Sequence, residues 1–308
     1  MTKQTPLDTD EIALPTPRQA APQTISSLVE VDLGGLSHRG NVRANNEDTF
    51  FVGRFDRSMR ALLTNLPPGE YPPASAETSY GMLVADGMGG QAGGQVASRT
   101  AVRVLLDLVL RTPDWVMRLD DAWLREVIRR MEQRVQHVGG ALAAMARDQP
   151  GLSGMGTTLT LACSLGADLL LVHVGDSRAY LMHRGELRQL TRDQTLVQGL
   201  VDAGILSAEE ATRHRLRHVL TGVLAADGKK VPVECGRFRL ADGDQVLLCS
   251  DGLTEMVPEA EVSAALLRPG PAAECCRGLV DRALEAGGAD NVTVVLARYR
   301  FPVQASSS

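Results

Sequence analysis

Hydrophobic and polar positions alternate in several segments of this 308-residue chain, as they do in strands that bury one face. The first strand is predicted to begin at Leu28, in LVEVDLGGLS, and the second to cover 48–52. YGMLVAD is a continuous apolar run that ends at a glycine-rich turn, which is typical of a buried strand. Further strands are predicted in GTTLTLACSL, DLLLVHVG, RAYLMHRG, VPVECGRFRL, QVLLCS and VTVVLARYR.

Helical periodicity lies between these strands. Apolar residues share one helix face in two long stretches, 97–108 and 124–138. Shorter helices are predicted after Ser207, which has capping-box spacing to Glu210, and at 258–267 and 272–286. Because helices come in blocks between blocks of strands, the predicted class is α+β, with two antiparallel sheets packed together and helices outside.

One domain is predicted, from residue 28 to residue 302. Residues 1–27 hold few large apolar side chains, so burial cannot offset the entropy cost of ordering them, and a disordered tail is expected. A second, short tail is expected at 303–308. Residues 56–80 contain LPPGEYPPASAET, whose prolines and glycine predict an irregular insertion within the domain.

Composition narrows the classes of function. The net charge of -5 gives no clustered basic field for nucleic acid, and no run of about 18 apolar residues predicts a membrane span. The N-terminal residues do not resemble a signal peptide, so a cytoplasmic location is expected. The five cysteines lack zinc-ligand spacing, and adjacent Cys275 and Cys276 are expected to be apolar helix residues rather than a vicinal disulfide.

Acidic residues at the ends of predicted strands are the candidate chemistry. Each segment alone is a common turn, but several carboxylates at the ends of buried strands would repel one another and lose hydration. Hard divalent cations resolve both problems because they prefer oxygen ligands. The segments are Asn45-Asn46-Glu47-Asp48, Asp86-Gly87-Met88-Gly89-Gly90, Ser250-Asp251-Gly252 and Asp290-Asn291, with Asp176 in HVGDSRAY as a fifth acidic position.

These segments resemble the PP2C-type (PPM) family of metal-dependent serine/threonine protein phosphatases, and most closely its bacterial branch. The matching segments appear in the family's order and cover about residues 36–297. Singly they are weak signals, but as an ordered set they are specific. They are RANNEDTF, VADGMGGQAGGQVAS, GMGTTLTLA, HVGDSRAYL, LTRDQTLVQGLVDAGILSAEEA, LLCSDGL and DNVTVV.

The resemblance implies a four-layer α-β-β-α sandwich with two Mn²⁺ or Mg²⁺ ions at one end of the sheets. It implies that Asp86 bridges both ions, that the Gly87 carbonyl is a further ligand, and that Asp48 orients the ligand shell. The remaining implied ligands are Asp251 and Asp290 at one ion, Glu47 at the other, and Asp176 with Asp251 at a third, weaker position.

The same resemblance implies the reaction. Water activated by the two ions would attack phosphorus, and Arg43 would bind the substrate phosphate, for which a guanidinium group is well suited. Eukaryotic members often have a histidine, a proposed proton donor, where this chain has Met88, so the general acid is not identified. The basic cluster around Arg215 and Arg217 falls in the family's flap region and is either a phosphopeptide contact or a solvated surface.

Phosphorylated proteins are the implied partners, with a serine/threonine kinase as a further candidate. Two alternatives remain: a non-catalytic pseudophosphatase that acts as a binding module, and a regulatory phosphatase of an anti-sigma pathway. The five acidic positions are all present, which argues against the first alternative, and no sensor domain is visible for the second.

Overall fold

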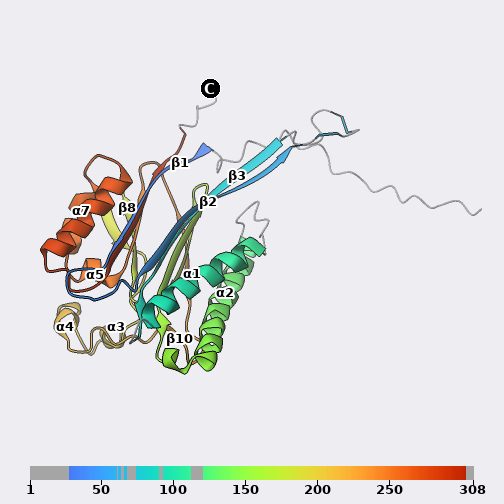
Figure 1. The fold of residues 1–308 in the computed structure, drawn as a ribbon. Coiled ribbons are helices and arrows are strands. Elements are labelled where there is room, and N and C mark those ends of the chain that lie inside the picture. Colours follow the sequence, from blue (N-terminus) through green and yellow to red (C-terminus); the bar gives the residue numbers. More distant parts are fainter. Residues whose placement is uncertain are drawn as a thin grey trace, which may run out of the picture.

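The computed structural model describes residues 28–60, 62–63, 66–67, 74–89, 93–111 and 121–302. The two predicted tails, 1–27 and 303–308, lie outside the described residues. Within the described part, sheets and helices are arranged in layers, with two sheets face to face and helices on both outer sides (Figure 1). The predicted α+β class with two antiparallel sheets is therefore confirmed.

The two large sheets have five strands each, and neighbouring strands in both are antiparallel. Between them lies an apolar core that includes Met82, Leu171 and Val295. In spatial order, the first sheet is β1 (Glu30–His38), β13 (Val292–Arg300), β12 (Gln245–Cys249), β8 (Arg178–His183) and β9 (Glu186–Gln189). The second is β11 (Glu234–Arg239), β7 (Asp168–Val174), β6 (Leu159–Leu165), β3 (Ala74–Ala85) and β2 (Thr49–Arg60).

Helices cover the outer face of each sheet. The second sheet packs against α1 (Gly93–Arg111) and α2 (Asp121–Asp148), which bury Ala101, Leu105 and Val138 as their predicted periodicity requires. The first sheet packs against α5 (Asp251–Thr254), α6 (Glu259–Leu266) and α7 (Ala272–Glu285). Burial of each large aliphatic side chain in these layers contributes about 1.5–3 kcal/mol of transfer free energy.

Small elements complete the sandwich at one end. A three-stranded sheet that was not predicted consists of β10 (Leu224–Ala225), β5 (Gly156–Thr157) and β4 (Gly87–Met88). The remaining short helices are α3 (Leu196–Asp202), α4 (Ala208–Arg213) and a 3₁₀ turn at Pro150–Leu152. The predicted capping box is confirmed: Ser207 and Glu210 bond each other's backbone N–H at the start of α4.

The prediction of an irregular insertion at 56–80 is wrong for most of the described part of it. Residues 56–60 and 74–80 extend β2 and β3 into a hairpin that projects beyond the sheet (Figure 1). The charged residues Arg54, Asp56 and Arg57 hid the strand pattern, and the prolines that suggested a loop lie between the two strands rather than within them. Most of residues 61–73 lie outside the described residues.

The cysteine prediction also holds for what the structure describes. All five cysteines are free, and Cys275 and Cys276 lie in α7, where Cys276 is fully buried in the core. Burial raises the pKa of the Cys276 thiol to about 12, so this side chain is an apolar packing group rather than a nucleophile.

Candidate metal centre

Antiparallel pairing brings the predicted acidic residues to one end of both sheets. In the second sheet β2 begins where β3 ends, since Thr49 pairs with Ala85, so Glu47 and Asp86 are neighbours. In the first sheet β12 ends beside the start of β13, which brings Asp251 close to Asp290. The end of β7 reaches the same edge and carries Asp176 into the following turn.

These strand ends surround a cavity of about 760 Å³. The cavity lining includes seven of the predicted site residues: Arg43, Glu47, Asp86, Gly87, Asp176, Asp251 and Asp290. A separate cavity of about 540 Å³ lies over the outer face of the second sheet, and side chains such as Leu105, Leu161 and Leu170 make it mainly apolar. None of the predicted site residues lines this apolar cavity, so the candidate metal centre is in the first cavity.

Backbone and hydroxyl contacts fix the position of Asp86. Its backbone N–H donates to Thr158 Oγ1 at 2.9 Å, and its carbonyl accepts from the Thr158 N–H and from Thr157 Oγ1, each at 2.9 Å. These bonds use the main chain of Asp86 and leave its carboxylate at the cavity wall. The result is a rigidly placed anionic group at the end of a buried strand.

Two glycines allow α1 to approach this strand end closely. A Cβ on Gly87 would collide with the Gly94 carbonyl, and a Cβ on Gly94 would collide with the Glu47 carboxylate and the backbone of Gly87. Glycine is therefore required at both positions by the packing. This contact places the N-terminal turn of α1 against Glu47, and the helix dipole favours negative charge there.

Asp48 lies beneath the cavity and is only 8% exposed. Its Oδ2 accepts hydrogen bonds from Ser250 Oγ at 2.8 Å and Thr293 Oγ1 at 2.6 Å. Its Oδ1 is buried and has no hydrogen-bond partner among the described residues. Burial raises the pKa of Asp48, chiefly through desolvation, and the two hydroxyl bonds oppose this rise. A buried carboxylate oxygen without a donor fits a position behind a metal ligand shell.

The cavity carboxylates repel one another. Asp86 and Asp251 are partly exposed to the cavity, yet desolvation raises the pKa of each well above its ordinary value. The acidic neighbours that raise the pKa of Asp86 further are, from the largest effect, Asp48, Asp251, Asp176 and Asp290. Such a cluster is unfavourable by itself and becomes favourable with divalent cations, so the donor set fits hard metal ions.

Arg43 contacts the cluster through Asp290. Its guanidinium Nη2 donates to Asp290 Oδ2 at 2.5 Å, and this bond raises the pKa of Arg43. The Arg43 side chain is 57% exposed, so the guanidinium stands at the mouth of the cavity. Asn291 secures the neighbouring backbone, because its Oδ1 accepts from the Glu47 N–H at 2.7 Å and its Nδ2 donates to the Asn45 carbonyl at 2.9 Å.

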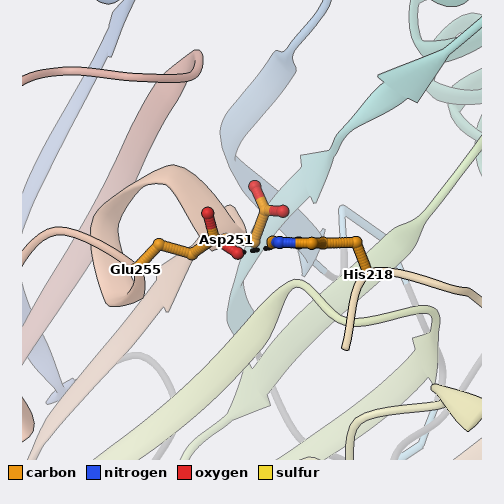
Figure 2. A group of neighbouring side chains, drawn as sticks. All are labelled: His218, Asp251 and Glu255. Atoms are coloured by element: carbon orange, nitrogen blue, oxygen red, sulfur yellow. Dashed lines mark ion pairs between the residues drawn. The ribbon is translucent and has the colours of Figure 1, made fainter. Parts of the chain in front are cut away.

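The tightest set of potential ligands differs from the predicted one. Among the described residues, the set of three acidic, histidine or cysteine side chains with ligand atoms within 4.8 Å of one another is His218, Asp251 and Glu255 (Figure 2). His218 Nδ1 lies 2.9 Å from Glu255 Oε1. The predicted ligands share one cavity, and one of them, Asp251, belongs to this set.

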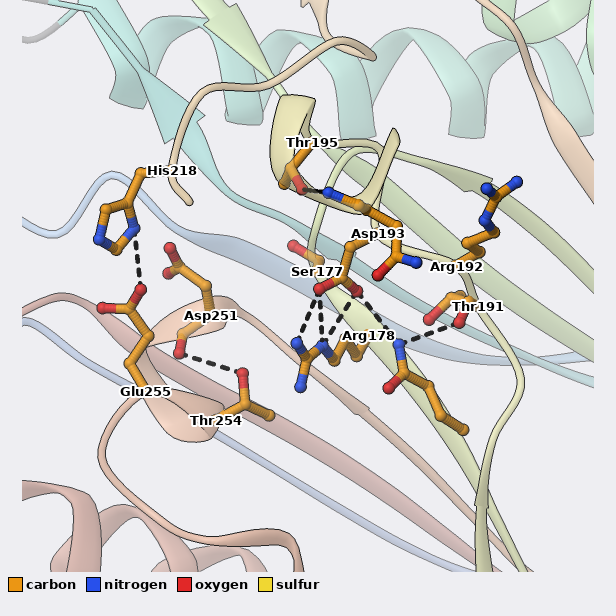
Figure 3. A network of polar contacts seen from close by, with 12 residues as sticks. Ser177, Arg178, Thr191, Arg192, Asp193, Thr195, His218, Asp251, Thr254 and Glu255 are labelled. Carbon is orange, nitrogen blue, oxygen red and sulfur yellow. Dashed lines mark hydrogen bonds and ion pairs between the residues drawn. The ribbon is translucent and has the colours of Figure 1, made fainter. Parts of the chain in front are cut away.

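Asp176 lies beside a strong ion pair. Arg178 contacts Asp193 through its Nε and Nη2 (Figure 3), and the shortest of these contacts is 2.7 Å. Desolvation raises the pKa of Asp176 to about 6, with Asp193 adding to the rise and Arg178 opposing it. Arg178 is thus ion-paired with Asp193, whereas Asp176 is part of the cavity lining.

Other predicted residues fall outside the cavity. Arg215 and Arg217 are exposed, and neither lines the cavity, although His218 and Leu220 of the same segment do. His38 accepts a bond from the Gly40 N–H and does not line it either. His173 is fully buried and bonded to Thr160, so it is a core residue rather than a site residue. Met88 does line the cavity, and its side chain cannot donate a proton.

Several functional contacts were not predicted. Ser250 and Thr293 hold Asp48, and Asn291 holds the 45–47 backbone. His218 and Glu255 were missed as well. For Glu255 a signal existed, because it follows Asp251 by four residues in a helical turn and so lies on the same face.

Comparison with known proteins supports the family. The family model described as Protein phosphatase 2C matches residues 74–279. The serine/threonine protein phosphatase PstP of Mycobacterium tuberculosis is 38% identical over 261 residues, which cover 85% of this chain and 43% of that protein. The serine/threonine phosphatase stp of Listeria innocua is 38% identical over 259 residues, covering 84% of this chain and 92% of that protein. The chain thus spans less than half the length of the M. tuberculosis relative.

A solved structure agrees in fold. The catalytic domain of PstP, in complex with two manganese ions, superposes with a TM-score of 0.69 at 35% identity, covering 88% of this chain and 99% of that chain. Among the described residues of our structure, no helix is both long and apolar enough to span a membrane. The family predicted from the ordered motifs is confirmed: this chain belongs to the protein phosphatase 2C family.

Proposed function

We propose that this chain is a metal-dependent phosphatase that hydrolyses phosphoserine and phosphothreonine in proteins at a centre of two Mn²⁺ or Mg²⁺ ions. The carboxylates that converge on one cavity and raise one another's pKa carry this proposal. The names of the relatives and the two manganese ions of the PstP structure support it. A serine/threonine kinase is the natural counterpart, because such an enzyme produces the substrate.

The residues would divide the metal binding as follows. Asp86 would contact both ions, and the Gly87 carbonyl would be a further ligand. Asp251 and Asp290 would complete one ion and Glu47 the other, while a third, weaker ion would lie at Asp176 and Asp251. His218 and Glu255 are added to that third position, because their ligand atoms lie within 4.8 Å of those of Asp251. When bound, the ions supply positive charge for the phosphate oxygens and lower the pKa of the attacking water.

The protein's own side chains would bind the substrate phosphate and orient the metal ligands. Arg43 stays protonated beside Asp290 and presents its guanidinium at the cavity mouth, where it would bind the substrate phosphate through charge-assisted hydrogen bonds. Asp48, held by Ser250 and Thr293, keeps one oxygen available beneath the ligands and would orient a water or ligand there. Thr158 bonds the main chain of Asp86 and so fixes the position from which its carboxylate would hold the metal ions.

The test begins with the purified chain, p-nitrophenyl phosphate and Mn²⁺, and then uses a phosphothreonine peptide. Asp251→Asn removes a charge without changing size, so we expect turnover to fall at least about a hundredfold while the melting temperature is maintained. Asp281→Asn, on the exposed face of α7, is the matched control and should be fully active. Full activity of Asp251→Asn would contradict the site, and inactivity of the unaltered chain with Mn²⁺ would favour a pseudophosphatase.

The flap, defined here as residues 195–220, would contact protein substrates. Its exposed Arg215 and Arg217 provide positive charge next to the segment that brings His218 into the cavity. Replacement of both arginines by alanine should raise KM for a phosphopeptide about three- to tenfold and leave p-nitrophenyl phosphate unaffected, because only the peptide reaches beyond the cavity. Equal effects on both substrates would remove this role.

A further inference from the structure

The flap is closed at its base by main-chain contacts. The Leu196 N–H donates to the Val219 carbonyl at 2.8 Å, and Thr195 and Leu220 form an isolated antiparallel bridge. Between these ends lie α3 and α4, which bury few side chains; Val197 is the buried residue of α3, and α4 has none. The position of the flap is therefore set at its base rather than by a core of its own.

One residue joins this base to the strand end that carries Asp176. The Gln194 N–H donates to the Gly175 carbonyl at 2.7 Å, and the Gly175 N–H donates to Gln194 Oε1 at 3.1 Å. The Gln194 carbonyl accepts from the Thr221 N–H at 2.8 Å, and its side-chain Nε2 donates to the Pro232 carbonyl at 3.4 Å. Gln194 thus contacts the turn before Asp176 and the chain that returns from the flap.

The neighbouring glycines fit this arrangement. A Cβ on Gly222 would collide with the Gln194 side-chain amide, so a larger residue there would displace it. Gly175 has a φ of +117°, which favours glycine, and its N–H is the group that Gln194 Oε1 accepts from. The Gly222 position is therefore kept free of a side chain beside the amide, and Gly175 meets the amide through its N–H.

We propose that Gln194 is a positioning residue, which locks the flap base to the Gly175–Asp176 turn and so sets how the flap presents His218 and its arginines to a protein substrate. The substrate part of this inference rests on the proposed function, whereas the lock itself does not. Gln194 does not line the cavity, so it acts through the flap rather than on the phosphate. A small aryl phosphate, which occupies the cavity and does not extend to the flap arginines, is expected to be much less sensitive to it.

The experiment compares Gln194→Ala with the unaltered chain by two readouts. The first is trypsin cleavage at the exposed flap arginines, Arg213, Arg215 and Arg217, followed by mass spectrometry. Gln194→Ala keeps the main-chain bonds of this residue and removes both side-chain bonds. Because cleavage follows the open population of a segment, this loss should speed cleavage about five- to tenfold. The second is the KM for a phosphothreonine peptide, which should rise about tenfold, while kcat for p-nitrophenyl phosphate changes less than threefold.

Three further variants keep the test decisive. Gln136→Ala is the matched control, because Gln136 Nε2 also donates to a main-chain carbonyl, that of Val231 at 2.8 Å, but lies outside the flap. It should leave both readouts unchanged. Gly222→Ala should reproduce the effect of Gln194→Ala by expelling the amide, and Gln194→Met keeps the side-chain volume if the alanine variant folds poorly.

The outcomes separate the inference from the proposed function. Faster flap cleavage at an unchanged melting temperature, with a selective rise in peptide KM, supports the lock. Flap cleavage equal to that of the unaltered chain, or an equal loss of kcat on both substrates, overturns it. If the unaltered chain hydrolyses neither substrate, the proposed function fails, and the cleavage rates still decide whether Gln194 holds the flap.

Discussion

This protein holds its acidic side chains in two different ways in two regions. On β7 and before α3, carboxylates are paired with arginine: Asp168 lies 2.9 Å from Arg237, and Asp193 lies 2.7 Å from Arg178. At the cavity, Asp86, Asp176 and Asp251 share one lining with further carboxylates, and the pKa of each is raised. The first region is neutralised by the chain itself, whereas the second is suited to positive charge from outside.

The difference between the two regions shows which carboxylates stabilise the fold and which destabilise it. Ion pairs such as Asp193–Arg178 satisfy hydrogen bonds within the fold and connect strand β8 to the base of the flap. The cavity carboxylates oppose folding, because each charge is desolvated next to others of the same sign. Such an arrangement is typical of a functional site, where local stability is given up for ligand binding.

The largest expected effect is on the stability of the folded protein, when divalent cations are added to the cavity carboxylates. Mn²⁺ at about a hundred times its dissociation constant should stabilise the folded protein by about 2.7 kcal/mol, because the unfolded chain lacks the site. For a domain of this size the melting temperature should rise by roughly 5–10 °C, measured by calorimetry against a sample in EDTA. The melting temperature of Asp86→Asn should rise much less with Mn²⁺. An equal rise in this variant would mean that the ions bind elsewhere.

The sequence predicted one side of this comparison better than the other. Asp86 and Asp251 follow apolar runs, which predicted their place at the ends of buried strands, and the resemblance to the PP2C-type family predicted that they meet. The pairing of Asp168 with Arg237 depends on which strand lies beside β7, and no local pattern encodes that neighbour. For the same reason His218 was missed, since a folded flap brings it to Asp251 across 33 residues of chain.

The fold shows a similar division. Strands with clear apolar runs and helices with caps or glycine stops were predicted within a few residues, as α7 and the Ser207 cap illustrate. The outer half of the β2–β3 hairpin was not, because its residues pair only with each other and have no core face over most of their length. Periodicity reports burial, so a projecting ribbon gives little signal.

A smaller effect is expected from pH in the absence of metal. The pKa of Asp176 is raised from 3.8 to about 6 in the folded protein. The folded state therefore keeps this proton to a higher pH than the unfolded state, so its contribution to stability is present below about pH 4 and is lost as pH rises through about 6. In EDTA, Asp176→Asn should be more stable than the unaltered chain by roughly 1–3 kcal/mol at pH 7 and equal to it near pH 4.

Urea unfolding across this pH range measures the difference directly. The subtraction of the two proteins cancels all other titrating groups, provided that the substitution leaves the neighbouring carboxylates in place. A difference that does not vary with pH would mean that Asp176 is not destabilised by its surroundings. In that case the contrast between the two regions would be limited to Asp86 and Asp251.

The smallest effect tests the paired region. Asp168 lies at the start of β7, away from the end that carries Asp176, and it accepts bonds from Arg237 and Arg239. Asp168→Asn should lower the free energy of unfolding by about 1–2 kcal/mol, because a partly buried arginine loses its counterion, whereas phosphatase activity should be unchanged. Asp107→Asn, which breaks an exposed pair with Arg111 on α1, should cost only about 0.3–0.5 kcal/mol. If Asp168→Asn instead stabilised the protein as Asp176→Asn is expected to do at pH 7, pairing with arginine would not be what separates the two regions.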